Sequence, residues 1–246
     1  MGKRRPKRSR AADNIHRPMI EARNQTQQRL IESIVKNDIS FGIGPAGTGK
    51  TFVSASLACD ALDTGEAERI VICRPLQEAA GEKLGFLPGT LEEKCDPYLR
   101  PLLTVMERFF SFDSGRYQNL IDKQRIEIVP LAFMRGRSFE NCWIICDEAQ
   151  NMAEEDIFML MTRLGENSKM IILGDPEQRD RREAKGLEAA SVILGNCHGI
   201  GFTQFTNGDV VRHETVKRIL TLWSRAKKNR NRGDNEPDNN SELKAA

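Results

Sequence analysis

One short segment constrains the fold of this chain more than any other part of it. Residues 44–51 read Gly-Pro-Ala-Gly-Thr-Gly-Lys-Thr, a full match to the pattern G-x-x-x-x-G-K-[ST]. An apolar run at 39–43 precedes the segment, and a helical pattern from Lys50 to about Leu62 follows it. A buried strand, a glycine-rich turn and a helix in this order form the phosphate-binding loop of parallel α/β proteins. We therefore predict an α/β fold whose loop binds the phosphates of a nucleotide.

The residue types in this loop suit a triphosphate that is bound together with Mg²⁺. Glycines let consecutive backbone N–H groups point at one anion, and the helix that starts there adds the positive end of its dipole. Lys50 is expected to reach the β- and γ-phosphates, and the Thr51 hydroxyl is expected to hold Mg²⁺. The predicted phosphate-contacting residues are Gly44, Pro45, Ala46, Gly47, Thr48, Gly49, Lys50 and Thr51.

A pair of acidic residues follows a second buried strand. Asp147 and Glu148 come directly after the apolar run at 143–146. A carboxylate at such a strand end can hold Mg²⁺, which suits Asp147 as a metal ligand. The adjacent carboxylate can orient and deprotonate an attacking water, which suits Glu148 as the catalytic base. Two adjacent acids are also typical of a helix N-terminus, which is the alternative interpretation.

A third polar turn follows the apolar run at 170–173. It reads Gly-Asp-Pro-Glu-Gln and ends at Gln178. A glutamine at a strand end can contact both the attacking water and the γ-phosphate, so it can report whether that phosphate is still present. We predict a catalytic role for Gln178, with a plain Asp-Pro turn as the alternative.

Apolar runs alternate with helical patterns along most of the chain. This alternation is typical of a mostly parallel, doubly wound sheet with helices on both faces. Strands are expected at 39–43, 69–73, 125–129, 143–146 and 170–173. Helices are expected around 30–35 and at 50–62, 91–110, 154–164, 186–194 and 213–227. The sequence thus predicts a single domain over residues 19–228, between a flexible basic arm at 1–18 and a disordered polar tail at 229–246.

The composition argues against a membrane or zinc protein. No stretch approaches the run of about 18 apolar residues that a membrane span needs, and no apolar segment follows the basic N-terminus. The six cysteines lack the close pairs of a zinc site, so they are expected to be reduced and buried in the core. We expect a cytoplasmic protein.

Positive charge is concentrated at two places although the net charge is only +2. Six lysines and arginines lie within residues 1–10, and five more lie within residues 225–232. Such clusters commonly contact the phosphate backbone of nucleic acids. A solubilising role for the basic arm is the alternative.

Taken in order, the three strand-end motifs resemble those of the PhoH family, the phosphate-starvation-inducible ATPases related to superfamily 1 helicases. The resemblance covers nearly all of residues 24–220. Its most specific part runs from Gly81 to Pro101, which a generic phosphate-binding loop would not predict. The matching segments are 23–24 with Gln27, 44–51, 74–75, 81–89, 96–101, 134–137, 147–151, 162–163 and 210–213.

The resemblance implies a RecA-like P-loop NTPase domain that hydrolyses ATP. It implies that Gln27 recognises adenine through both faces of its amide; an exposed first-turn residue is the alternative. It also implies that Arg212 lies near the γ-phosphate and assists catalysis. Arg163 is a second candidate for that task, with a surface position on a helix as its alternative. The stretch 74–88 corresponds to the region that lines the nucleic-acid path in the related helicases.

Two departures from the family pattern stand out. After Gln178 the family usually continues Asp-Leu-Pro, whereas this chain has Arg-Asp-Arg-Arg at 179–182, which adds positive charge near the site. Some relatives carry an N-terminal nuclease domain, and the roughly 20 residues before the core are expected to leave no room for one.

The predicted assembly and partners follow from the single core. Superfamily 1 helicases place ATP between two such domains, and this chain has one, so we expect a homo-oligomeric ring, a hexamer, with Arg212 or Arg163 acting in trans. RNA or single-stranded DNA is the expected partner, bound through its backbone. Three other functions stay open: a kinase, a nucleotide-gated scaffold and a chaperone-like ring ATPase.

Overall fold

The computed structural model describes residues 20–75, 91–110, 115–180 and 183–211, with residues 215, 216, 218, 219 and 222. The predicted arm at 1–18, the predicted tail at 229–246, Arg212 and most of the helix expected at 213–227 lie outside the described residues. Within the described ranges, no helix has both the length and the apolar character needed to cross a lipid bilayer.

A six-stranded parallel sheet forms the centre of the fold. Its strand order is β3-β2-β4-β5-β1-β6. The bounds are β1 Ile39–Ile43, β2 Arg69–Cys73, β3 Ile126–Ile128, β4 Cys142–Cys146, β5 Lys169–Gly174 and β6 Ile200–Gln204. The five strands expected from the sequence are confirmed to within one residue at each end. β6 was missed because Gly199 and Gly201 interrupt its apolar pattern.

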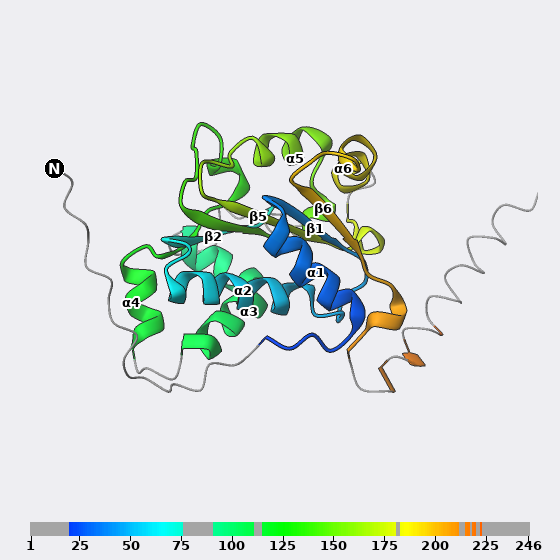
Figure 1. Cartoon of the computed structure of the whole chain (residues 1–246), viewed down its shortest axis with the longest axis horizontal. Helices are drawn as coiled ribbons and strands as arrows, with labels where there is room; N and C mark the ends of the chain where they lie inside the picture. Colours follow the sequence, from blue (N-terminus) through cyan, green and yellow to red (C-terminus); the bar gives the residue numbers. More distant parts are fainter. Residues whose placement is uncertain are drawn as a thin grey trace, which may run out of the picture.

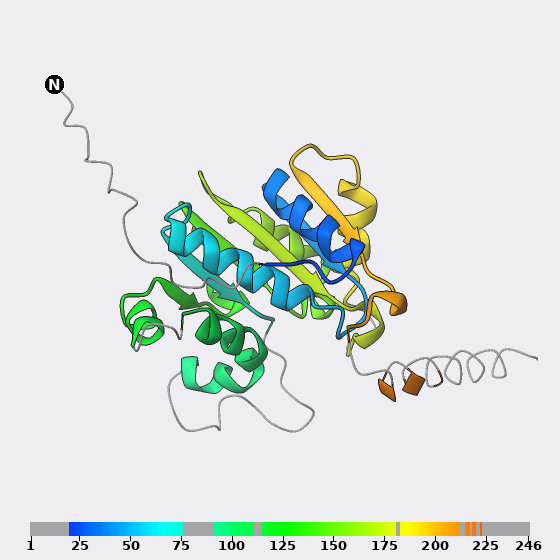
Figure 2. The same cartoon turned by 60° about the horizontal axis from the view of Figure 1, so that its bottom comes forward.

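Helices cover both faces of this sheet, which confirms the predicted doubly wound α/β class (Figure 1). One face carries α1 (Gln25–Lys36), α2 (Lys50–Thr64), α3 (Leu91–Phe110) and α4 (Arg116–Asp122). The other face carries α5 (Glu154–Met161) and α6 (Gly186–Leu194). The sequence did not predict α4, and α5 ends three residues earlier than expected. Figure 2 shows α1 and α2 side by side along the length of the sheet.

Two apolar clusters, one on each face, hold the layers together. In β2, Ile70 and Ile72 belong to the cluster under α1, α2 and α3, whereas Val71 and Cys73 belong to the cluster under α5 and α6. This alternation follows from the two-residue period of a strand and explains why the buried strands are apolar on both sides. Burial of each such large aliphatic side chain contributes about 1.5–3 kcal/mol. Trp143 is buried as expected, and so are the cysteines at 59, 73, 142 and 146, whereas Cys197 is exposed and the expectation of a buried cysteine is wrong there.

Side chains at both ends of α1 fix this helix against the sheet. The Asn24 side chain accepts a hydrogen bond from the backbone N–H of Gln27 at 2.8 Å and caps the N-terminus of the helix. At the other end, the Lys169 ammonium donates to the carbonyls of Ile34, Val35 and Asn37 at 2.9–3.0 Å. Because Lys169 begins β5, the helix that carries Gln27 is tied directly to the sheet.

The strand order brings the three predicted motifs together. Carboxyl ends of parallel strands meet at one edge of a sheet, and β4, β5 and β1 are consecutive in this order. Ile43 is in register with Gly174, and Cys146 is in register with Ile172. The turns after these three strands are therefore neighbours.

Candidate active site

The loop after β1 has the backbone conformation that its glycines permit. Gly44, Gly47 and Gly49 have φ angles of 134°, 80° and 85°, values that residues with a side chain rarely adopt. A Cβ at Gly44 would overlap the backbone carbonyl of Phe205, so this position also needs glycine for space. The loop leads directly into α2, whose N-terminal amides can bind an anion.

Lys50 lies buried inside this loop. Its ammonium donates to the carbonyl oxygens of Gly44 at 2.5 Å and Pro45 at 2.7 Å. Burial lowers the pKa of Lys50, and the negative charges of Asp175, Asp147 and Glu148 oppose that change. The three carboxylates lie on the strand ends next to the loop, so the field at the ammonium favours its charged form, as phosphate binding requires.

A hydrogen bond joins the loop to the end of β4. The Thr51 hydroxyl donates to Oδ2 of Asp147 at 3.1 Å, although 96 residues separate them in sequence. Burial raises the pKa of Asp147, and the neighbouring Glu148 raises it further. A hydroxyl and a carboxylate in contact are the hard oxygen ligands that suit Mg²⁺, which usually takes its other ligands from water and substrate phosphates. Within the described ranges, no group of three His, Cys, Asp or Glu side chains could hold a metal ion.

Glu148 is held in place by its backbone and by two side chains. Its φ of 59° lies in the left-handed region, which costs a non-glycine residue about 1–2 kcal/mol. Oε1 lies 3.3 Å from Nη2 of Arg74, and Oε2 accepts a hydrogen bond from the Gln150 amide at 2.5 Å. This turn therefore presents two consecutive carboxylates at one strand end with separate partners: Thr51 for Asp147, and Arg74 and Gln150 for Glu148.

Asp175 connects the third strand end to the phosphate-binding loop. This buried carboxylate accepts hydrogen bonds from the backbone N–H of Ala46 at 3.1 Å and from the Gln178 amide. It also accepts from the backbone N–H of Glu177 at 3.1 Å. The sequence prediction named only Gln178 in this turn. The structure brings Gln178 to the site edge through Asp175, where its side chain is exposed.

Gln150 is a site residue that the sequence analysis missed. Its side chain is 2% exposed; Nε2 donates to Glu148, and Oε1 accepts from the backbone N–H of Asp175 at 3.0 Å. One amide therefore links the turn after β4 to the turn after β5. The signals in the sequence were its position two residues after Glu148 and its place in the segment 147–151 that resembles the family.

Gln27 lies against the phosphate-binding loop. Its Nε2 donates to the carbonyl of Thr48 at 2.8 Å, and its Oε1 accepts from the backbone N–H of Arg23 at 2.8 Å. The side chain is 3% exposed, so it is not the exposed first-turn residue of the alternative interpretation. One amide N–H and one acceptor lone pair are not used by these two bonds. Adenine recognition by Gln27 stays a prediction.

The two candidate arginines differ in position. Arg163 follows α5 and precedes β5, so it lies toward the amino edge of the sheet, opposite the carboxyl-edge site. Its guanidinium donates to the carbonyls of Met159 and Arg137 and to the Thr162 hydroxyl. Arg212 lies outside the described residues. The preceding Val211 donates from its backbone N–H to the Gly47 carbonyl at 2.8 Å, which brings this part of the chain to the loop.

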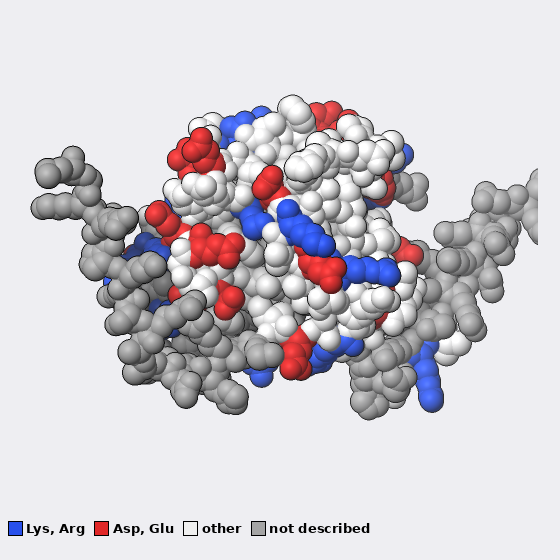
Figure 3. Space-filling view, in the orientation of Figure 1, with Lys and Arg blue, Asp and Glu red and all other residues white. Residues whose placement is uncertain are grey.

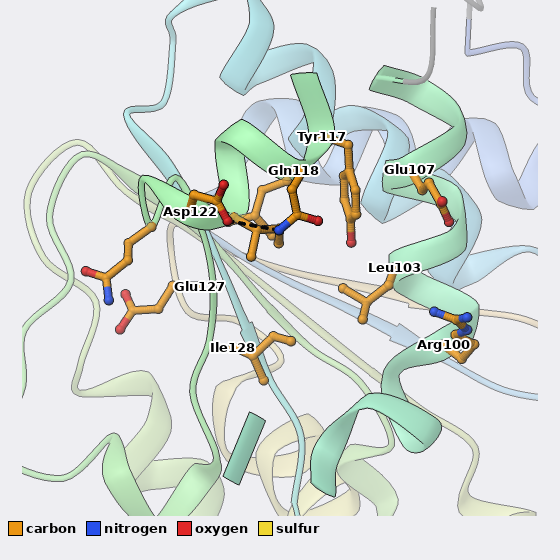
Figure 4. Close-up of a pocket in the computed structure, with 11 residues that line it drawn as sticks. Arg100, Leu103, Glu107, Tyr117, Gln118, Asp122, Glu127 and Ile128 are labelled. Atoms are coloured by element: carbon orange, nitrogen blue, oxygen red, sulfur yellow. Dashed lines mark hydrogen bonds between the residues drawn. The ribbon is translucent and has the colours of Figure 1, made fainter. Parts of the chain in front are cut away.

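A separate cavity of about 790 Å³ lies between α3, α4 and β3 (Figure 4). Its lining includes Arg100, Tyr117, Asp122 and Glu127, but none of the predicted site residues. β3 is four strand positions from β1 in the sheet, which corresponds to roughly 19 Å. The cavity is therefore distinct from the phosphate-binding site.

Comparison with solved structures finds distant similarity to viral large terminases. The large terminase of a thermophilic bacteriophage superposes with a TM-score of 0.49 at 14% identity, covering 80% of this chain and 48% of the terminase. The large terminase of bacteriophage HK97 gives a TM-score of 0.48 at 13% identity, with coverages of 74% and 39%.

Comparison with known sequences gives a much closer result. The PhoH-like protein of Synechocystis sp. is 44% identical over 210 residues, and that of Bacillus subtilis is 42% identical over 208 residues. The protein PhoH of Escherichia coli K12 is 38% identical over 216 residues. These alignments cover 85%, 84% and 87% of this chain, and 63%, 64% and 61% of the relatives. The chain thus spans about three fifths of the length of these relatives.

The family profile described as "PhoH-like protein" matches residues 19–224, a range that contains every residue assigned above to the site. The chain belongs to the PhoH-like protein family.

Proposed function

We propose that this protein hydrolyses ATP with Mg²⁺ and couples hydrolysis to the binding of RNA or single-stranded DNA. One observation carries the proposal: the Thr51 hydroxyl meets the Asp147 carboxylate at 3.1 Å, and Glu148 follows directly in the same turn. A phosphate-binding loop, a metal-ligand pair and a base for water are thus within one cluster. These are the parts that hydrolysis of a phosphoanhydride requires.

Each residue has a defined task in this scheme. The loop amides and Lys50 bind the β- and γ-phosphates and offset their charge. Thr51 and Asp147 hold Mg²⁺, which supplies positive charge at the transferring phosphate. Glu148 orients the attacking water and accepts its proton, while Arg74 and Gln150 hold the Glu148 carboxylate in position. Gln178 lies in the turn after β5, where it donates to Asp175, and its task in this scheme is to contact the γ-phosphate.

The nucleic-acid part of the proposal rests on charge. The sequence carries six lysines and arginines in its first ten residues, whereas acidic and basic side chains are interspersed on the face of the domain shown in Figure 3. The basic arm, together with the second basic cluster at 225–232, is therefore our candidate for phosphate-backbone contacts. Family membership supports the analogy with the related helicases.

ATP hydrolysis measured with and without a partner tests this function directly. We expect Mg²⁺-dependent hydrolysis without any acceptor, and a higher rate when RNA or single-stranded DNA is added. Deleting residues 2–10 removes six positive charges. Each phosphate contact that is lost from a single strand is expected to lower, by about 0.7, the slope of the logarithm of the binding constant against the logarithm of the salt concentration. A slope that the deletion leaves unchanged would exclude the arm from binding. Phosphate transfer to a small molecule or protein in place of water would identify a kinase.

We further propose that the active site is completed by a neighbouring copy in a hexameric ring. Arg163 lies at the edge of the sheet opposite the site, so it can approach a phosphate only in another subunit; Arg212 is the other candidate. Mixing Lys50→Ala subunits with Arg212→Ala or Arg163→Ala subunits is expected to restore hydrolysis at interfaces that combine an intact loop with an intact arginine. A monomer in sedimentation analysis, with no restoration, would reject the ring.

A further inference from the structure

Phe52 is an exposed aromatic residue in the first turn of α2, directly after the phosphate-binding loop. Its side chain is 50% exposed, whereas Lys50 and Val53 in the same helical turn are 8% and 1% exposed. Most of the remainder of α2 is buried. Of the large apolar side chains that the described part of the chain exposes, only Phe52 belongs to this loop and the first turn of the helix after it. The position offers a flat apolar surface beside an otherwise polar site.

The direction of a bound triphosphate can be inferred from the contacts of the loop. Thr51 faces Asp147 and the Glu148 turn, which mark the γ-phosphate end. Gln27 contacts the opposite flank of the loop, at Thr48 and Gly49. The nucleoside at the other end of the triphosphate must therefore leave the loop on the Gln27 side. Successive helical residues are 100° apart, so the Phe52 side chain is turned well away from the direction in which Thr51 meets Asp147.

Gln27 packs against Gly49, three residues before Phe52. A Cβ on Gly49 would come within 2.5 Å of Nε2 of Gln27, so the amide packs directly on this glycine. Phe52 lies three residues later, which is close to one helical turn along the same side. The end of the loop thus has an amide whose two bonds to Arg23 and Thr48 leave one N–H and one lone pair unused, and the helix turn that follows has an exposed aromatic ring. This is the combination that a nucleobase needs, since its face is apolar and its edge is polar.

We propose that Phe52 is the platform on which the nucleobase of the bound nucleotide stacks, and that Gln27 contacts the edge of that base. The inference rests on the proposed function, because it assumes that the loop binds a nucleoside triphosphate. Stacking on Phe52 supplies affinity for any base, since every base has an aromatic face. Discrimination between ATP and GTP then depends on the polar edge and therefore on Gln27.

Nucleotide affinities of Phe52 variants test this assignment. Phe52→Ala is expected to weaken ATP and GTP binding alike, by about tenfold, and to raise KM with little change in kcat. Affinity for inorganic tripolyphosphate, which has no base, is expected to stay at the wild-type value. Phe52→Trp keeps a stacking surface and is expected to bind ATP as tightly as the wild type, with tryptophan fluorescence quenched by ATP but not by tripolyphosphate. Phe52→Leu, which keeps apolar volume without a ring, is expected to resemble Phe52→Ala.

The matched control is Phe158→Ala, which removes a 65% exposed phenylalanine from α5 on the other face of the sheet. It is expected to bind both ligands like the wild type. If Phe52→Ala binds ATP normally, or if it loses tripolyphosphate to the same extent as ATP, the stacking assignment is wrong. If the wild type binds neither ligand, the proposed nucleotide function itself fails, so the two failures are distinguishable.

Discussion

Replacing Glu148 by glutamine is expected to lower the rate of ATP hydrolysis by about 10²- to 10⁴-fold, the range that a positioned general base contributes. The amide is nearly the same size as the carboxylate and can still occupy the turn next to Asp147, but it cannot accept a proton from water. ATP affinity is expected to stay close to the wild-type value, because Glu148 makes no contact with the phosphate-binding loop in the described hydrogen bonds. Single-turnover hydrolysis and nucleotide binding, measured on the same preparation, separate the two effects.

Glu177→Gln is the matched control for this variant. Glu177 is an exposed acid in the turn after β5, at the same edge of the sheet, and only its backbone N–H contacts Asp175. Its replacement is expected to leave the hydrolysis rate within about twofold of the wild type, because surface substitutions of this kind are usually near neutral. A Glu148→Gln protein that turns over ATP at the normal rate would favour a nucleotide-gated scaffold over an enzyme.

Replacing Asp147 by asparagine is expected to change activity and stability in opposite directions. Hydrolysis in the presence of Mg²⁺ should fall by about 10³-fold, because metal-ion charge contributes several kcal/mol to such reactions and each 1.36 kcal/mol corresponds to a factor of ten. The free energy of unfolding in the absence of nucleotide should rise. Burial, and then the charge of Glu148, raises the pKa of Asp147, so the ionised carboxylate destabilises the fold. The Thr51 hydroxyl can donate equally well to the asparagine carbonyl.

The pH dependence of unfolding checks the physical reason for that result. A carboxyl group whose pKa is higher in the folded state binds its proton more tightly there, so its contribution to stability increases as the pH falls through the raised pKa. The asparagine variant should lack this contribution, and its stability advantage over the wild type should shrink at acidic pH. Asp180→Asn, at an exposed position on the same edge, should show neither effect. An asparagine variant at 147 that is less stable than the wild type at neutral pH would contradict the role assigned to burial.

The sequence alone determined the parts of this protein that depend on local chemistry. The loop at 44–51 requires glycines with positive φ angles and a helix start, and both requirements are readable in eight consecutive residues. The acid pair was predicted from its place after an apolar run. Burying a charged side chain is costly, so adjacent carboxylates mark the point where a buried strand ends. Four of the five strands that were placed correctly are apolar on both faces, and β3 alternates between isoleucine and Glu127. β6 escaped because two glycines break that pattern, and α4 escaped because it is only seven residues long.

Only the tertiary structure decided which side chains share the site. Gln150 and Asp175 belong to the site because β4, β5 and β1 are neighbours in the sheet. The order of strands in a sheet cannot be predicted from a local sequence pattern. The same holds for the pairing of Arg74 with Glu148, which depends on β2 lying next to β4. The packing of Gln27 against Gly49 depends on how α1 docks on the sheet, partly through Lys169. These contacts join residues 22 to 135 positions apart. They depend on how the elements pack, so they cannot be predicted from neighbouring residues in the sequence.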